Sequence, residues 1–245
     1  MFVDPPQSPH ERPREASLRR PLLVALGVTA ATTAASRGLP VDYQALGVAA
    51  IFLGAAYLLV VRGDDTAAIR RYGLSLGGLV EPEPLDVWRL LRAAAAAVGW
   101  ALLVAAAVFP AFWVGFVLWW QPRGAFAPAV PLDLGSEALG QLLVIALPEE
   151  VFYRGYLQTA LDEAAPPRQR WLGARIGWAV PLTSLAFALG HVATELSPAR
   201  LAVFFPSLLF GWLRARTGGV GAPVAFHATC NLYSSFLARG YGLLP

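Results

Sequence analysis

Two adjacent glutamates and an arginine interrupt an apolar stretch of the sequence, LPEEVFYRGYL, which runs from Leu147 to Leu157. Glu149 and Glu150 are neighbours, and Arg154 follows four residues after Glu150. A charged side chain at the centre of a lipid bilayer costs between about 3 and 17 kcal/mol, depending on how the cost is determined. Ionisable groups in such a segment therefore indicate a functional site by default.

The spacing of these three charges predicts different roles for the two glutamates. Glu150 and Arg154 lie four residues apart, in the order that favours an acid–base pair on one face of a helix. We therefore expect a structural ion pair. Glu149 is rotated by about 100° from Glu150 around the helix axis and has no partner on this helix. The simpler alternative is a salt bridge beside a glutamate that faces water.

Two later apolar segments carry the other candidate residues. His191 ends the segment FALGH, and His227 and Asn231 lie four apart in HATCN. Each segment alone is weak evidence, because a single histidine near a helix end is more often a packed or interfacial residue. The expected depths allow both segments to approach Glu149 near the middle of the bilayer if the helices tilt, but they do not demonstrate a shared site.

Together these residue types could hydrolyse an amide bond without a covalent intermediate. A carboxylate and an imidazole can remove a proton from water. A second imidazole and a carboxamide can stabilise the oxyanion that forms. Two alternatives stay open. Two histidines and one glutamate match the three protein ligands of a catalytic zinc, and a Glu–His chain can relay protons.

We expect no metal and no other cofactor. The metalloprotease signature H-E-x-x-H is absent. A metal-bound histidine usually donates its other ring N–H to an oxygen acceptor, and no carboxylate lies three or four residues from His227. Asn231 also stands where a zinc ligand would more often be His or Glu.

The composition places these residues in a polytopic membrane protein. Of the 245 residues only 14% are charged, compared with about 25% in soluble domains, and the mean hydropathy is +0.53. The single cysteine, Cys230, excludes an internal disulfide and a cysteine metal cluster. The net charge of +3 requires no nucleic-acid partner.

We therefore predict an all-α bundle of seven transmembrane helices, with an eighth re-entrant or peripheral element as an alternative. Residues 1–18 are expected to be a disordered cytosolic tail and residues 19–245 one transmembrane domain. A cleaved signal peptide would also explain the two arginines before the first apolar run, but a membrane helix fits the rest of the chain better. Pro110 should kink the long third helix. The expected helices span residues 21–36, 43–61, 87–120, 136–161, 172–196, 199–216 and 223–238.

The arginines predict the orientation of this bundle. All 19 basic residues are arginine. With a cytoplasmic N-terminus, 14 arginines lie on the inner side and four on the outer side, which agrees with the positive-inside rule. The inner set is Arg12, Arg14, Arg19, Arg20, Arg62, Arg70, Arg71, Arg89, Arg92, Arg168, Arg170, Arg175, Arg214 and Arg216, and the outer set is Arg37, Arg123, Arg200 and Arg239.

Three motifs in this order resemble those of the CPBP intramembrane proteases. The segments EEVFYR, FALGH and HATCN correspond to EExxxR, FxxxH and HxxxN. The family includes the eukaryotic CAAX prenyl endopeptidase and bacterial Abi-type and bacteriocin-processing enzymes. The resemblance covers residues 136–240, while the first 130 residues add only hydropathy. It implies a structural pair of Glu150 and Arg154.

The resemblance also implies a mechanism. Glu149 and His191 would activate water, and His227 and Asn231 would stabilise the oxyanion. The mechanism it implies is of the glutamate type and uses no bound metal. We thus expect an intramembrane endopeptidase. The alternatives are a zinc metalloprotease that uses the same residues, or a non-catalytic immunity, scaffold or ion-relay protein.

The absence of lysine and the Abi-like layout indicate a bacterial inner-membrane protein. Its expected partners are the lipid bilayer and a protein or peptide with a cleavage site close to the membrane. Processing of C-terminal sorting tails, as in the myxosortase-like subgroup, and processing of leader peptides are both open.

Overall fold

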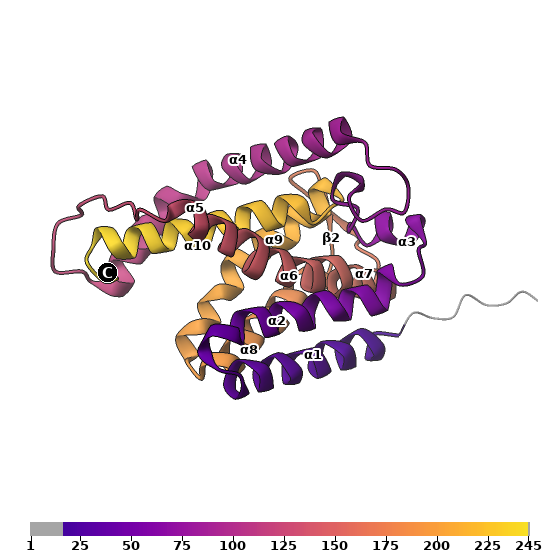
Figure 1. The fold of residues 1–245 in the computed structure, drawn as a ribbon, viewed down its shortest axis with the longest axis horizontal. Coiled ribbons are helices and arrows are strands. Elements are labelled where there is room, and N and C mark those ends of the chain that lie inside the picture. The colour runs from indigo at the N-terminus through magenta and orange to yellow at the C-terminus, as the bar shows by residue number, and fades with distance from the viewer. Residues whose placement is uncertain (1–16, 245) are drawn as a thin grey trace, which may run out of the picture.

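The computed structural model describes residues 17–244, and the predicted N-terminal tail therefore lies almost entirely outside the described residues. The described chain is nearly all α-helical, as predicted, and folds into a bundle of long helices (Figure 1). The first half contains α1 (Arg19–Gly38), α2 (Val41–Ala56) with a π-helical continuation (Tyr57–Val61), α3 (Thr66–Arg71), a 3-10 turn (Leu76–Gly78) and α4 (Val87–Trp120).

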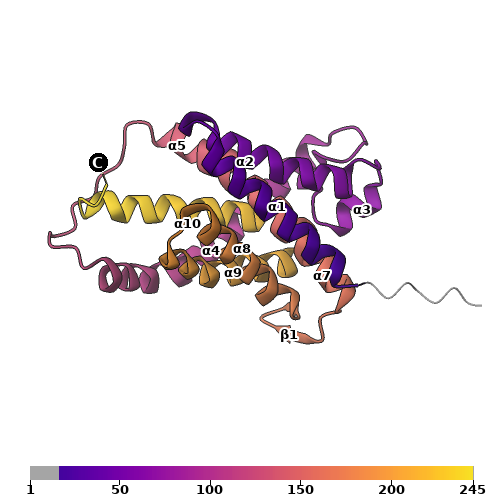
Figure 2. The same cartoon turned by 90° about the horizontal axis from the view of Figure 1, so that it is seen from below.

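The second half carries all three motifs. Its elements are α5 (Leu134–Leu139), a π-helix (Gly140–Ala146), α6 (Leu147–Glu150), a second π-helix (Val151–Leu157), α7 (Gln158–Ala164), β1 (Gln169–Trp171), β2 (Ala174–Ile176), α8 (Ala179–Glu195), a 3-10 helix (Pro198–Val203), α9 (Phe204–Thr217) and α10 (Gly221–Gly240). The view from below shows α1 and α2 side by side across the bundle (Figure 2).

The predicted helix 136–161 is observed as one continuous helical segment from α5 to α7, but it is not a regular α-helix. Two π-helical stretches, Gly140–Ala146 and Val151–Leu157, flank the short α6 segment that holds both glutamates. π-Helical turns are rare and occur frequently at functional sites, where the extra residue changes the direction of side chains. Compared with a regular α-helix, the π-helical turns therefore shift the directions in which the glutamates and their neighbouring residues point.

The predicted bounds are correct where a strong terminating signal exists and wrong where one was missed. Helix α4 begins at Val87 because Asp86 caps it by accepting hydrogen bonds from two backbone N–H groups. Helix α8 begins at Ala179 rather than at residue 172, because an antiparallel hairpin of β1 and β2 occupies the preceding segment. This hairpin is the one departure from the predicted all-α class among residues 17–244.

Two of the described helical segments are long and apolar enough to cross a membrane by length and composition, namely Val41–Val61 and Val87–Trp120. Pro110 lies inside the second without ending it. The count of seven crossings and the kink at Pro110 stay predictions.

Several loops lie together at one end of the bundle, which we call the arginine-rich end. It comprises the connections 62–86, 165–178 and 217–220. Arg71 forms an ion pair with Glu163 at 3.2 Å, which joins α3 to α7. The backbone N–H of Val220 donates to the carbonyl of Gly73 at 3.0 Å, which joins the α9–α10 turn to the same region. The described chain also starts at this end, on the right in Figure 1.

The remaining connections gather at the other end, which we call the C-terminal end. The Arg37 guanidinium, at the end of α1, donates to the carbonyl of Ala193 near the end of α8. Arg239 forms an ion pair with Glu137 at 3.0 Å, which joins the last turn of α10 to α5. Successive long helices thus run in opposite directions between two ends that differ in sequence.

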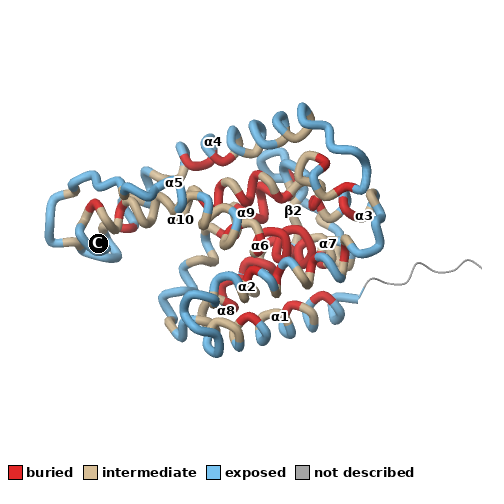
Figure 3. Tube along the Cα trace, viewed as in Figure 1, coloured by how far each residue is buried: buried red, intermediate tan, exposed pale blue. Residues whose placement is uncertain are grey.

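The core lies around the motif-bearing helix (Figure 3). Phe152 is fully buried and packs against Phe52 of α2, with ring centroids 5.4 Å apart. Phe52 also contacts Tyr153 at 5.5 Å. Helix α2 therefore packs directly on the glutamate motif, and the N-terminal half contributes more than hydropathy.

Candidate active site

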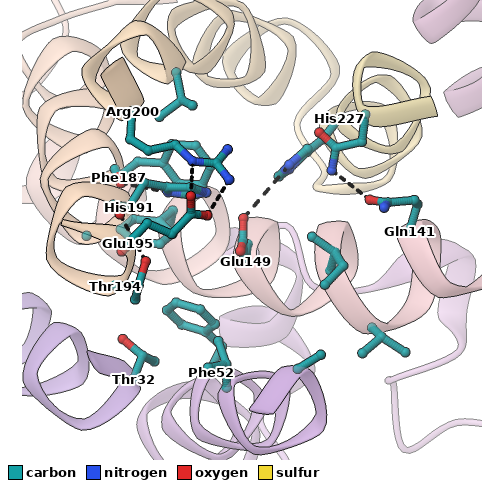
Figure 4. A pocket seen from close by; sticks show the side chains of 18 of the residues that line it. Thr32, Phe52, Gln141, Glu149, Phe187, His191, Thr194, Glu195, Arg200 and His227 are labelled. Carbon is teal, nitrogen blue, oxygen red and sulfur yellow. Dashed lines mark hydrogen bonds and ion pairs between the residues drawn. The ribbon is translucent and has the colours of Figure 1, made fainter. Parts of the chain in front are cut away.

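A cavity of about 600 Å³ lies between the helices and contains the four residues predicted to be catalytic (Figure 4). Glu149 comes from α6, His191 from α8, and His227 and Asn231 from α10. The folded chain therefore brings together side chains that lie up to 82 positions apart in the sequence. Helices α1 and α2 complete the wall with Thr32, Ser36, Gln44, Ala45, Val48 and Phe52.

Glu149 is held in the cavity without a direct partner. Its Oε2 atom is buried and accepts no hydrogen bond from the described residues. The nearest opposing group is Nε2 of His227, at 3.9 Å, which is longer than a hydrogen bond. The Glu149 side chain is 13% exposed, so water can reach it from the cavity. A carboxylate in this position can accept a proton from a bound water molecule.

Glu150 contacts two partners, one of which the sequence did not predict. Its Oε1 accepts from Nη1 of Arg154 at 2.9 Å, which is the expected ion pair. The same oxygen also lies 2.9 Å from Nδ1 of His227. Because a carboxylate can only accept, the Nδ1 atom must carry the proton in this contact. Glu150 therefore fixes the orientation of the His227 ring and turns its Nε2 atom toward Glu149.

Arg154 is fully buried and contacts several elements besides Glu150. Its Nη2 atom donates to the backbone carbonyl of Ser207 at 3.2 Å and to the hydroxyl of the same residue. Its guanidinium lies over the rings of Phe187 and Phe210, at 4.6 and 5.1 Å from their centroids. The charge is thus balanced by one carboxylate and two aromatic faces, and it ties the glutamate helix to α8 and α9.

His191 is oriented by its own helix. Its Nδ1 atom lies 3.0 Å from the carbonyl of Phe187, one turn earlier. A carbonyl accepts hydrogen bonds, so Nδ1 carries the proton and Nε2 is free to accept one. The ring also packs on Phe187, with centroids 4.4 Å apart. The FxxxH spacing therefore has a physical basis, because the phenylalanine supplies both the packing surface and the hydrogen-bond acceptor.

Asn231 has a partner that sequence reasoning missed. Its Nδ2 atom donates to Oε1 of Gln141 at 2.8 Å, from the first π-helical stretch. Gln141 also lines the cavity. A polar carboxamide inside the apolar run before Glu149 was the available signal. Through this bond Gln141 fixes one N–H of Asn231 and leaves the second N–H of that amide for another acceptor.

One argument against zinc was wrong. No carboxylate lies near His227 along its own helix, but Glu150 reaches its Nδ1 atom from α6. His227 therefore has the acceptor that a zinc-bound histidine commonly has. Within residues 17–244, however, no three His, Cys, Asp or Glu side chains are grouped so that they could hold a metal ion. A zinc site at Glu149, His191 and His227 would require these side chains to move.

The comparison with known families agrees with the motif assignment. Residues 131–233 match the family model described as type II CAAX prenyl endopeptidase Rce1-like. Over these residues, which make up less than half of the chain, the sequence is similar to the Rce1-like CAAX protease family. The matched segment contains all six motif residues, from Glu149 to Asn231. No curated protein and no solved structure matches the chain. The match indicates a membrane-embedded peptidase in general terms.

Proposed function

We propose that this protein is a glutamate-type intramembrane endopeptidase. The observation that carries the proposal is the unpartnered carboxylate of Glu149, which faces His227 in a cavity that His191 and Asn231 also line. A buried carboxylate without a partner is costly, and such groups persist where they serve a reaction.

In the proposed first step, Glu149 and His191 activate a water molecule. The free Nε2 of His191 and the free Oε2 of Glu149 both accept hydrogen bonds, so a water between them would lose a proton to one of them as its oxygen attacks the peptide carbonyl. The carbon–oxygen bond forms, the carbon–nitrogen bond then breaks, and the held proton passes to the leaving amine.

His227 and Asn231 would stabilise the oxyanion. Asn231 has one N–H free for this contact. The Nδ1 proton of His227 is directed to Glu150, so a contact from Nε2 requires a second proton and an imidazolium ring. Glu150 and Glu149 then carry two negative charges, and Arg154 and the His227 imidazolium carry two positive charges. The site would be neutral overall, which reduces the cost of holding four charged groups in the membrane.

The same geometry supports a second candidate, a proton relay. Glu149 and His227 lie 3.9 Å apart, close enough for one intervening proton carrier. A relay, however, gives no reason for the Asn231–Gln141 pair or for a cavity of about 600 Å³. These two features favour hydrolysis, because a peptide must enter the site and its oxyanion must be bound.

The proposed setting is the cytoplasmic membrane of a bacterium, with the N-terminus in the cytoplasm and seven helices in the bilayer. The proposed substrates are proteins or peptides with a cleavage site close to the membrane surface. Sorting tails and leader peptides both fit this description.

Comparative proteomics of membranes that contain the wild-type protein or the Glu149→Gln variant would test the proposal. We expect at least one precursor to be cleaved only with wild type. The purified protein should then cleave a peptide that spans this junction. Absence of any protein-dependent cleavage, combined with proton flux in liposomes, would favour the relay. Activity that is lost in strong chelator and restored by zinc would favour the metalloprotease.

A further inference from the structure

The cavity lies in only one part of the bundle. Its lining residues come from the part of α1 after Thr32, the part of α2 before Tyr57 and the part of α8 after Ala186. None comes from the connections 62–86, 165–178 or 217–220, which form the arginine-rich end. Because successive long helices are antiparallel, these parts of α1, α2 and α8 meet at the C-terminal end.

The cavity is closed toward the arginine-rich end and open toward the other. Phe187 and Phe210 line its inner side. Behind them lies the fully buried guanidinium of Arg154, which contacts both rings and pairs with the fully buried Glu150. At the opposite side the ion pair of Glu195 and Arg200 lines the cavity, with side chains 46% and 44% exposed (Figure 4). The entrance therefore lies at the C-terminal end.

The two ends differ strongly in positive charge. Twelve arginines of the described residues lie at the arginine-rich end and four at the C-terminal end. The positive-inside rule places an end with such an excess in the cytoplasm. The twelve are Arg19, Arg20, Arg62, Arg70, Arg71, Arg89, Arg92, Arg168, Arg170, Arg175, Arg214 and Arg216, and the four are Arg37, Arg123, Arg200 and Arg239.

From these observations we infer that the cavity opens to the extracytoplasmic side of the membrane, and that its substrates are exported, membrane-anchored proteins cut at a site on that side. The substrate assignment rests on the proposed function, whereas the orientation does not. A prenylated tail at the inner leaflet, or a leader peptide that stays in the cytoplasm, would lie on the closed side. The inference therefore favours the sorting tails of exported proteins over leader peptides.

The lining is suited to an extended peptide that enters from an aqueous surface. Polar side chains, Ser36, Gln44 and Ser235 among them, line the cavity on the side of the C-terminal end. Apolar side chains such as Val48 and Ile145 also line it, and Ile145 precedes Glu149 by four residues on the same helical segment. A substrate would thus present a polar segment at the entrance and place apolar side chains beside the scissile bond.

Two exposed glycines provide a matched test of the orientation. Gly38 lies at the C-terminal end and Gly63 at the arginine-rich end, and a Cβ added to either meets no atom within 4 Å. Cys230 is the only cysteine, so Cys230→Ala gives a cysteine-free background for Gly38→Cys and Gly63→Cys. In intact spheroplasts, a membrane-impermeant maleimide should label Gly38→Cys at least ten times faster than Gly63→Cys. Permeabilisation should make the two rates similar.

Cys230 itself reports on the cavity in the unmodified chain. It lines the cavity and is partly buried. A small, charged thiosulfonate reagent should modify it in spheroplasts but not in sealed inverted vesicles. Labelling of Gly63→Cys in spheroplasts, with Gly38→Cys protected, would overturn the inferred orientation. So would modification of Cys230 in inverted vesicles alone.

Mapping the new termini of the cleaved precursors tests the substrate assignment. We expect every Glu149-dependent cleavage site to lie on the extracytoplasmic side of its membrane anchor. Cleavage sites in cytoplasmic segments would overturn this inference and leave the proposed protease function intact. If labelling gives the expected orientation but no Glu149-dependent cleavage occurs, the proposed function fails and the substrate assignment fails with it.

Discussion

Two carboxylates in this protein, the buried Glu81 and the partly buried Glu149, have opposite surroundings. Glu81, between α3 and α4 at the arginine-rich end, accepts hydrogen bonds from Arg70, Arg89 and Ser75 through both of its oxygens. Glu149, in the cavity, has a buried oxygen with no partner among the described residues and faces His227 at 3.9 Å. The partners of Glu81 all lie within 11 positions of it in the sequence, whereas His227, which faces Glu149, lies 78 positions away.

The comparison separates a carboxylate that holds structure from one that is available for chemistry. A fully hydrogen-bonded carboxylate has no lone pair left to accept a proton from water. An unpartnered one keeps this capacity but contributes nothing to stability and carries the cost of desolvation. The number of hydrogen-bond partners of an acidic side chain therefore indicates whether it is structural or available for chemistry, whereas its residue type does not. Glu150 lies between the two cases, since it pairs with Arg154 and also orients His227.

The most direct test of this distinction between the two carboxylates is to remove the charge of Glu149. Glu149→Gln should lower kcat/KM by about 10² to 10⁴, the usual contribution of a general base, because an amide cannot take a proton from water. The melting temperature should stay the same or rise, because a buried unpaired charge is lost. The control Glu137→Gln alters the ion pair with Arg239 outside the cavity and should keep most activity. Full activity of Glu149→Gln would exclude it as the base.

Arg154→Ala should give the opposite pattern, with stability lost first. Removing one partner of a buried ion pair typically costs about 3–5 kcal/mol, because the remaining charge is left uncompensated. Here Glu150 would lose Arg154, and His227 would lose part of its support. Melting in detergent and folded yield are the readouts. Arg200→Ala is the matched control, because its pair with Glu195 is exposed and should contribute little to stability. Equal melting of both variants would contradict the prediction.

Asn231→Ala should reduce the rate and leave the fold intact. Loss of one oxyanion donor costs about 10²–10³ in kcat. Substrate binding should change less than kcat, because the contact forms only as the oxyanion develops. Thr229→Ala, on the same helix but with its hydroxyl bonded to the Ala225 carbonyl, is the control. A loss confined to KM would contradict the oxyanion role.

Much of this site could be predicted from spacing, and the part that could not depends on contacts between helices. Glu149 was predicted because it lies in an apolar segment without a partner on its own helix, and His191, His227 and Asn231 were predicted from the four-residue intervals in FALGH and HATCN. Their catalytic roles followed from the resemblance to the CPBP motifs. The Glu150–His227 bond joins residues 77 positions apart. No local pattern encodes such a contact, and its absence from the prediction led to a wrong argument about zinc.

The fold likewise contains elements that local sequence patterns predict and elements that they do not. The bounds of α4 were predicted correctly because a long apolar run extends from Val87 to Trp120, and the structure adds Asp86 as the N-cap of this helix. The β1–β2 hairpin was missed because its strands have three residues each, too few for an alternating pattern. The two π-helical stretches beside the glutamates were also missed, since single-sequence periodicity assumes a regular helix.

The smallest expected effect concerns the structural carboxylate itself. Hydrogen bonds from Arg70 and Arg89 hold the pKa of Glu81 well below its ordinary value. A group with a lowered folded-state pKa stabilises the protein above its unfolded-state pKa, and this stability is lost as the pH falls through the folded-state value. The contribution of Glu81 is therefore complete at neutral pH and declines below about pH 4.5. Because Arg70 and Arg89 are about half exposed, solvent screening keeps the effect small.

Glu81→Gln should accordingly lower the melting temperature by a few degrees at pH 7, and the difference from wild type should shrink as the pH approaches 3. Glu83→Gln, which alters an exposed contact with Thr66, should change neither the melting temperature at pH 7 nor its dependence on pH. Peptidase activity at pH 7 should be kept in both variants, because neither residue reaches the cavity. If Glu81→Gln abolished cleavage while the protein stayed folded, the separation of structural and chemical carboxylates would be wrong. A loss of melting temperature that persisted unchanged to pH 3 would show that Glu81 acts through its shape rather than its charge.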